Sequence, residues 1–135
     1  MEKVLITAKM FLIEGGCNAC GFVNCCTYTA HFTDSHSQTL DDLNPESLVM
    51  TVALKNGWRQ SVEPIGIGEE AFFLKKQGEA IQIIDDSFKT VFKKGMKTIT
   101  AVKKDCELPT IYETTNQVLT EMLEIPAVEF ELETI

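Results

Sequence analysis

The sequence predicts an α+β fold in which an antiparallel sheet of about five or six strands is packed by two or three helices. Two observations favour strands: residues 26–32 and residues 96–102 alternate apolar and polar side chains. A third favours helix, because apolar residues recur at helical spacing across residues 110–124. At 135 residues the chain fits a single domain, residues 1–135, which needs neither metal nor disulfide in order to fold.

The strand at residues 26–33 places Cys26, Tyr28 and Phe32 on an apolar face, and Thr27 and His31 on the other. Two further strands, at 70–75 and 80–84, flank a Gln-Gly turn, and residues 89–93 form another strand or a helical turn. After Pro126, apolar residues alternate with three glutamates, which predicts a half-buried strand over residues 127–134 at a sheet edge. That strand either pairs within its own sheet or joins two copies of the chain.

Three segments are predicted as helices. The helix at 110–124 has a capping box formed by Thr110 and Glu113. Residues 45–55 carry helix caps but many strand formers, and helix is favoured. Residues 5–16 fit a helix that starts at Thr7 and stops at Gly15, with a strand as the alternative, whereas residues 33–44 are polar and predict a loop. The predicted core comprises Cys26, Tyr28, Phe32, Phe73, Ile99, Val118, Leu119 and Met122.

The net charge of −8 disfavours nucleic acid as a partner, because an acidic surface repels the phosphate backbone. Residues 75–104 hold eight lysines, whereas residues 107–135 hold seven glutamates and no cation. These segments either neutralise each other across the fold or leave an acidic face for a basic partner. Lys9 interrupts the longest apolar stretch, so no membrane insertion is expected. As written the chain carries no export signal and indicates a cytoplasmic protein, although a trimmed exported protein would look the same.

Four cysteines lie within ten residues, at positions 17, 20, 25 and 26, and Cys106 stands apart. Such a cluster serves a metal, a redox couple or a disulfide, or has no activity. Cys25 and His31 share a strand face but lie roughly 20 Å apart, too far to hold one ion at ligand distances of about 2 Å. A zinc site would therefore use the thiols of Cys17, Cys20 and Cys25, with Cys106 or His36 as the fourth ligand. The main expectation is no cofactor, with zinc as the alternative.

No catalytic or cofactor-binding residue is predicted. His31, His36, Asp34, Asp41 and Asp42 could suggest acid–base or metal chemistry, but a solvated polar loop explains them better. The Gly-Ile-Gly run at 66–68 is followed by two glutamates, which would repel a phosphate.

Five segments, taken in order, resemble a family of small bacterial exported proteins or lipoproteins of unknown function with a PsbP/Mog1-like α/β/α sandwich. They are LITAKMFLIEGG (5–16), CTYT (26–29), VEPIGIGEEAFF (62–73), VFKKGMKTITAV (91–102) and TTNQVLTEML (114–123). The resemblance implies a central antiparallel sheet with helices on both faces and no catalytic residue. The expected function is therefore a non-enzymatic binding or assembly module that engages a protein partner or a second copy. The alternative is a metal- or thiol-dependent protein that uses the cluster from Cys17 to Cys26, and an enzyme of another type is left open.

Overall fold

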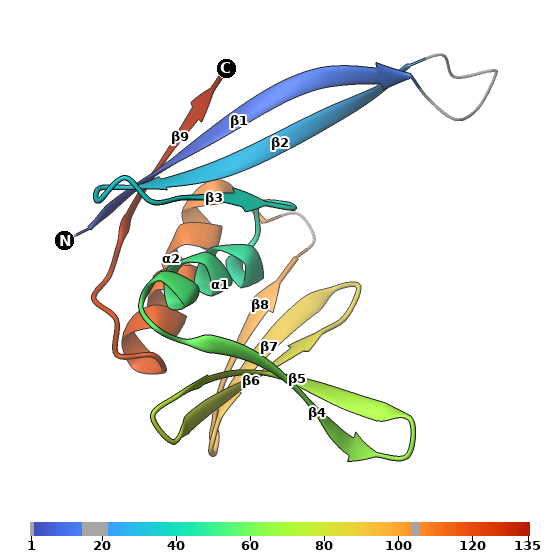
Figure 1. Cartoon of the computed structure of the whole chain (residues 1–135), viewed down its shortest axis with the longest axis vertical. Coiled ribbons are helices and arrows are strands. Elements are labelled where there is room, and N and C mark those ends of the chain that lie inside the picture. The colour runs from blue at the N-terminus through green and yellow to red at the C-terminus, as the bar shows by residue number, and fades with distance from the viewer. Residues whose placement is uncertain (1, 15–21, 104–105) are drawn as a thin grey trace. The chain divides into compact units, whose positions relative to one another are not determined.

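The computed structural model describes residues 2–14, 22–103 and 106–135. The chain divides into two compact units, and each is described by itself. The first unit comprises Met1–Leu43 and Val128–Ile135, and the second comprises Asn44–Ala127. The first unit thus takes its last strand from the far end of the chain (Figure 1).

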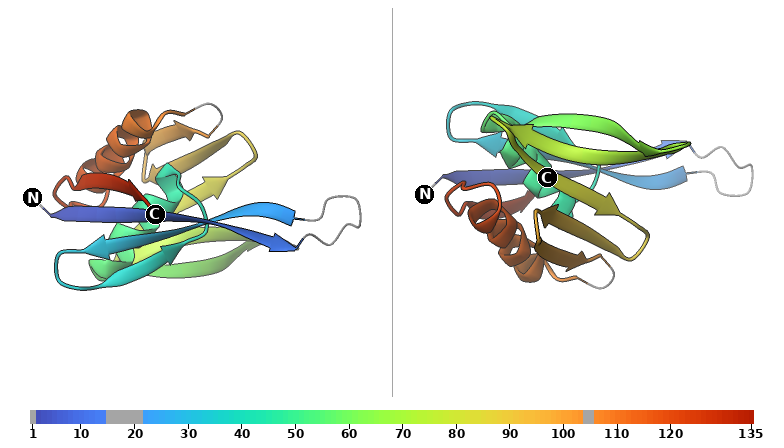
Figure 2. Two further views of the ribbon diagram at one scale, coloured as in Figure 1. Left: turned by 90° about the horizontal axis from the view of Figure 1, so that it is seen from above. Right: turned by 90° about the horizontal axis from the view of Figure 1, so that it is seen from below.

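The first unit is a four-stranded sheet with the order β3-β2-β1-β9. Its strands are β1 (Lys3–Glu14), β2 (Phe22–Phe32), β3 (Ser37–Leu40) and β9 (Glu129–Thr134). β1 and β2 form a long antiparallel hairpin, and β9 runs parallel to β1 over residues 3–8. β3 pairs with β2 only over residues 28–31, so the far part of the hairpin is a two-stranded ribbon that reaches beyond both outer strands (Figure 2).

The predicted helix at residues 5–16 is wrong, because residues 3–14 form β1. Val4, Ile6 and Ala8 are buried, while Leu5 and Thr7 between them are half-exposed. This period of two matches a strand, and pairing with β2 and β9 on both sides outweighs the local helix signals. The predicted faces of β2 are confirmed, with Ala30 and Phe32 buried. Cys26 and Tyr28 on that face are only half-buried, less than predicted.

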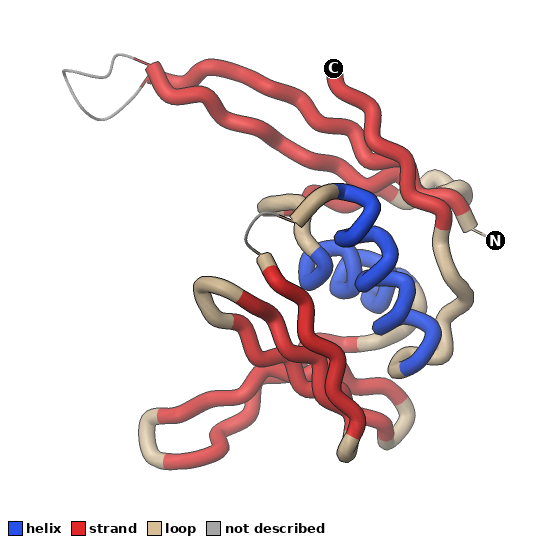
Figure 3. The backbone as a smooth tube through the Cα atoms, turned by 180° about the vertical axis from the view of Figure 1, so that it is seen from behind, coloured by secondary structure: helices blue, strands red, loops and turns tan. Residues whose placement is uncertain are grey.

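The second unit is a five-stranded antiparallel meander, β4 to β8 in chain order, with two helices. The elements are α1 (Pro45–Lys55), β4 (Arg59–Gly66), β5 (Glu69–Lys76), β6 (Glu79–Asp85), β7 (Lys89–Lys94), β8 (Lys97–Val102) and α2 (Leu108–Glu121). The helices lie side by side over one face of this sheet (Figure 3). The core of this unit includes Leu74, Ile81, Ile83, Phe92, Ile99, Leu48, Val52, Val118, Leu119 and Met122.

The predicted helix at 45–55 is confirmed. Asn44 caps it by accepting a hydrogen bond from the Ser47 N–H at 2.9 Å, and the Ser47 hydroxyl is bonded to the Asn44 backbone in return. The predicted helix at 110–124 is confirmed as α2, and its predicted apolar stripe is buried. Its predicted capping box is wrong, because Glu107 is the N-cap residue and makes no side-chain capping bond.

The predicted α+β class is confirmed, but the predicted single central sheet is wrong. The described residues form nine strands in two sheets and two helices, not one central sheet of five or six strands. β3 lies within the predicted loop at 33–44, and β4 was not predicted. The arrangement is not that of a PsbP/Mog1-like sandwich: Phe73 is half-exposed and Phe72 is exposed, so this sheet is not covered on both faces.

Candidate binding sites

The first candidate site is a shallow cavity of about 360 Å³ on the first unit. Strands β1, β2 and β9 supply its lining, which consists of Lys3, Leu5, His31, Phe32, Thr33, Glu131 and Glu133. Leu5 is the register partner of both His31 and Glu131, so three strands meet at this point. The cavity brings together one imidazole, one ammonium group and two carboxylates.

His31 ties three strands of this sheet together. Its Nε2 lies 3.1 Å from the Thr7 hydroxyl of β1, and its Nδ1 lies 3.0 Å from the Ser37 hydroxyl of β3. A neutral imidazole can donate through one ring nitrogen and accept through the other, so both contacts are satisfied at once. Both ring nitrogens are engaged by hydroxyl groups, so no carboxylate in the described part of the chain orients this ring as in a catalytic triad. This geometry supports a structural role for His31.

The acidic side chains of β9 form a row along the outermost strand of this sheet. Glu129, Glu131 and Glu133 are all exposed. Glu131 pairs with Lys3 at 2.6 Å, and this hydrogen bond raises the pKa of Lys3. The described residues offer no ion-pair partner to Glu129 or Glu133. Glu129 adds to the electrostatic field that raises the pKa of Lys3 but forms no ion pair with it, so Glu129 and Glu133 can each pair with an approaching cation.

The backbone of β9 is also open on one side at Leu132 and Thr134. The Glu129 N–H donates to the Glu2 carbonyl and the Ile135 N–H donates to the Ala8 carbonyl, both at 2.9 Å. In a parallel pair alternate residues face the neighbouring strand, so Leu132 and Thr134 direct their backbone groups away from β1. An edge of this kind can accept an extended segment from another chain. The predicted edge strand at 127–134 is confirmed, and its pairing is internal.

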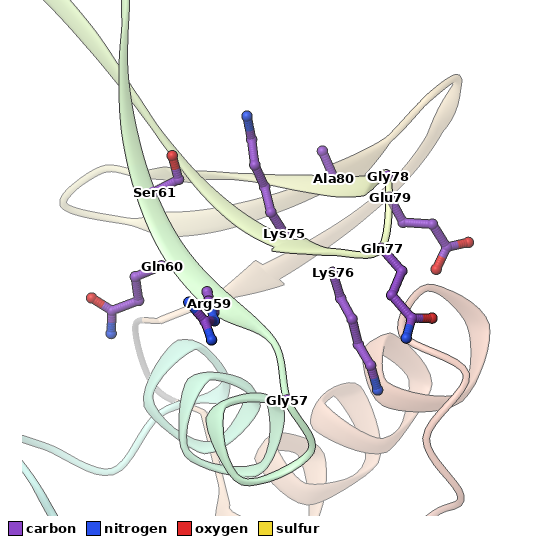
Figure 4. Close-up of a pocket in the computed structure, with 10 residues that line it drawn as sticks. All are labelled: Gly57, Arg59, Gln60, Ser61, Lys75, Lys76, Gln77, Gly78, Glu79 and Ala80. Atoms are coloured by element: carbon purple, nitrogen blue, oxygen red, sulfur yellow. The ribbon is translucent and has the colours of Figure 1, made fainter.

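The second candidate site is an open cavity of about 760 Å³ on the second unit (Figure 4). Its lining runs from Gly57 through the start of β4 to the end of β5 and the turn into β6. Three cations contribute to it, namely Arg59, Lys75 and Lys76, together with one acid, Glu79. Gln60, Ser61 and Gln77 add polar groups. This basic cavity was not predicted, and the one sequence signal for it is that Arg59 is the only arginine of an acidic chain.

The contacts of these cations differ. Lys75 pairs with Glu63 and lies 5.5 Å from the centre of the Phe73 ring. Lys76 extends in the opposite direction in Figure 4, and its Nζ donates to the Asn56 carbonyl at 2.7 Å. The side chain of Arg59 has no ion pair or hydrogen bond to any described residue. Arg59 is therefore the cavity's available cation.

The predicted zinc ligands do not appear together among the residues that the structure describes. Cys17 and Cys20 lie outside those residues, and Cys25 is described only as the β2 partner of Phe11. Cys106 belongs to the second unit, and its thiol donates to the Val102 carbonyl. Within the described ranges, no group of three or more His, Cys, Asp or Glu side chains is arranged to hold a metal. The zinc site stays a prediction.

Cys26 and His36 have simple surroundings. The Cys26 thiol raises the pKa of Tyr28 through a side-chain hydrogen bond, as expected for neighbours on one strand face. His36 is exposed and lies 3.0 Å from Asp34, which agrees with a solvated polar turn.

The predicted pairing of the lysine-rich and glutamate-rich segments is confirmed for α2 alone. Lys97 pairs with Glu121 at 3.2 Å, and Lys94 donates to the Met122 carbonyl at 2.7 Å. The ion-pair partner of Glu131 in β9 is instead Lys3, from the start of the chain.

Comparison with known proteins gives one family. Residues 1–132 match the model of a domain of unknown function, DUF4809. No curated protein and no solved structure gives a significant match to the chain. Neither described helix has the length and apolar character needed to cross a membrane. The match agrees with the predicted membership of a family of unknown function, whereas export stays a prediction.

Proposed function

Because the chain belongs to the DUF4809 family, a domain of unknown function, its role has to be inferred from its own surfaces. We propose that it is a non-enzymatic binding module that takes up an extended, basic segment of a protein partner along β9. The observation that carries this proposal is the open, acidic edge of the first sheet. Outward backbone groups at Leu132 and Thr134 lie beside the exposed carboxylates of Glu129 and Glu133.

Charge selects the partner on this edge. An added strand would place its side chains opposite those of β9, where unlike charges stabilise the pairing and like charges oppose it. Glu129, Glu131 and Glu133 carry three negative charges, and Lys3 balances one of them. A partner segment with Lys or Arg at alternate positions fits this pattern. A second copy of β9 would instead bring the glutamates of both copies together, so self-association through this edge is expected only in acid.

A peptide titration followed by NMR tests the proposal. The probe is an eight-residue peptide of alternating Lys and Val, added at low salt because screening acts over about 8–10 Å at physiological ionic strength. We expect shifts at the β9 amides and slower hydrogen exchange at Leu132 and Thr134. The double variant Glu129→Gln/Glu133→Gln should weaken binding about twofold to thirtyfold, since exposed ion pairs contribute about 0.2–1 kcal/mol each.

A second pair of variants separates strand addition from simple charge attraction. Thr134→Pro removes an outward N–H and should weaken binding, whereas Thr134→Ala keeps that N–H and should bind normally. Equal affinity for both variants would contradict strand addition. Sedimentation of the free chain at neutral and acidic pH checks the second-copy alternative. If the chain is a dimer at neutral pH and the Glu129→Gln/Glu133→Gln variant dimerises more tightly, the partner of β9 is a second copy of the chain and not a basic segment.

The second candidate function, a metal- or thiol-dependent protein, is supported by the spacing of the cysteines in the sequence. Cys25 lies in β2, three residues after Phe22, and is close in sequence to Cys17 and Cys20. The test is metal analysis by mass spectrometry together with a count of free thiols. One zinc per chain that is lost in Cys17→Ser/Cys20→Ser and kept in Cys26→Ser would favour this candidate. Disulfides in the purified protein would favour export, because they persist in oxidising compartments.

A further inference from the structure

The basic cavity of the second unit holds an unbalanced charge. Arg59 at the start of β4 is the register partner of Lys75 near the end of β5. Like charges directly opposite one another on neighbouring strands destabilise a sheet. Glu63 compensates Lys75, but no described carboxylate compensates Arg59. The free protein therefore keeps an unfavourable arrangement that a bound anion would relieve.

The groups around Arg59 are suited to hold an anion. Lys76 extends away from Lys75, the register partner of Arg59, and its Nζ donates to the Asn56 carbonyl, so Arg59 is the cation that can anchor a ligand. Gln60 and Gln77 line the same cavity and carry amide N–H groups that can donate to an anion. An arginine guanidinium donates two parallel hydrogen bonds to a carboxylate or a phosphate, which a lysine cannot do.

We propose that this cavity binds a carboxylate-bearing ligand, with Arg59 as its bidentate anchor. This inference is independent of the proposed function, because it concerns another sheet and a ligand of opposite charge. The volume of about 760 Å³ lies in the range of sites for organic ligands, so it accommodates the body of an organic acid or a peptide and not merely an ion.

The balance of charge around Arg59 favours a carboxylate over a phosphate. Glu63 is bonded to Lys75 and Glu79 to Lys94, so both acids near the site are compensated. The single charge of Arg59 is matched by one carboxylate, whereas a phosphate dianion carries one negative charge more. β4 is also an edge strand of its sheet, so an extended acidic peptide could lie beside it. A free organic acid would offer the same carboxylate without the peptide backbone.

Three probes test the ligand class by NMR titration of the full chain. They are an eight-residue peptide of alternating Glu and Val, the monocarboxylate benzoate, and inorganic phosphate. We expect shifts at the amides of Arg59, Gln77 and Gly78 with the peptide or with benzoate. Binding by the peptide alone identifies a peptide ligand, and tighter binding of benzoate identifies a small acid. Tighter binding of phosphate than of either carboxylate probe would overturn the ligand class, and binding by none of the three would overturn the site.

Variants test the anchor. Arg59→Gln should weaken carboxylate binding about 10- to 100-fold, and Arg59→Lys should give an intermediate loss because it keeps the charge without the planar fork. Lys93→Gln makes the same charge change at an exposed position on β7 outside the cavity lining, and should bind like wild type. Equal losses in Arg59→Gln and Lys93→Gln would overturn the proposal.

The melting temperature of the free protein gives a second readout. Since Arg59 faces Lys75 without compensation, Arg59→Gln should melt at the wild-type temperature or above it. A lower melting temperature would mean that Arg59 stabilises the fold, and would contradict the account of an uncompensated charge. The basic peptide that probes β9 should bind Arg59→Gln normally, so failure here is distinguishable from failure of the proposed function.

Discussion

Replacing Leu119 by alanine should destabilise the protein more than any single change at its surface. Leu119 lies in α2 with no exposed surface, and Val118 and Met122 beside it are equally buried. The helix packs against α1 and β8 within the second unit, so the side chain cannot move towards solvent when its neighbours shift. Leu119→Ala therefore removes fully buried volume and leaves a cavity.

The magnitude follows from the atoms removed. Three carbon atoms at about 0.8 kcal/mol each give about 2.4 kcal/mol of lost transfer free energy. The residual cavity brings the expected loss to about 3–4 kcal/mol, within the range of about 2.7–5 kcal/mol known for such changes. For a chain of this length each kcal/mol lowers the melting temperature by roughly 3–5 °C, so a decrease of roughly 10–15 °C is expected.

Thermal and urea unfolding followed by circular dichroism measure this loss. Thr120→Ala is the matched control, because Thr120 is the next residue of the same helix and is exposed, with its hydroxyl bonded to the Asn116 carbonyl at 2.9 Å. The control should change the free energy of unfolding by no more than about 0.5 kcal/mol. A Leu119→Ala protein that melts within 2–3 °C of wild type, roughly 1 kcal/mol or less, would refute the packing of α2 described above.

Two further predictions concern turns of the second sheet. The Asp86 carboxylate accepts from the N–H groups of Phe88 and Lys89, each at 2.8 Å, and these bonds hold its pKa below the usual 3.8. The stabilisation of the fold by these two hydrogen bonds is thus present above pH 3.8 and is lost as the pH falls through the pKa of Asp86 in the folded protein. Asp86→Ala should therefore melt at a lower temperature than wild type at pH 7, and the two melting temperatures should become equal in strong acid. Gly78 has a φ of +83° and open space where a Cβ would lie, so Gly78→Ala should cost about 1–2 kcal/mol from backbone conformation alone. Gln77 has a φ of +48°, so Gln77→Gly should change the urea midpoint in the opposite direction.

The elements that the sequence predicted correctly are those whose signals are local. The Asn44 cap and the following Pro45 specify α1 despite its many strand formers, because capping satisfies backbone donors that would otherwise be unpaired. The Gln77-Gly78 turn fixes the hairpin of β5 and β6, because both residues adopt a positive φ. Such features depend on a few neighbouring residues, which a single sequence displays.

The elements that were mispredicted depend on distant partners. β1 becomes a strand because β2 and β9 pair with it, and β9 arrives from more than 120 residues later in the chain. The division into two sheets also could not be predicted, because no local pattern indicates that β9 pairs with β1 and not with a strand of the meander. The basic cavity was missed because Arg59, Lys75 and Lys76 come together only through the register of β4 with β5.

Net charge is a poor guide to what such a protein binds, because charge acts locally. At physiological ionic strength exposed charges are screened beyond about 8 Å, so a ligand responds to the few groups around its site and not to the total of −8. β9 presents carboxylates to its surroundings, whereas the cavity at Arg59 presents cations. The two proposals therefore assign to the same acidic chain one surface for a basic segment and another for a carboxylate. Glu69 and Glu70 repel a phosphate at the turn of Gly66 and Gly68 alone, and each surface has to be judged by its own neighbours.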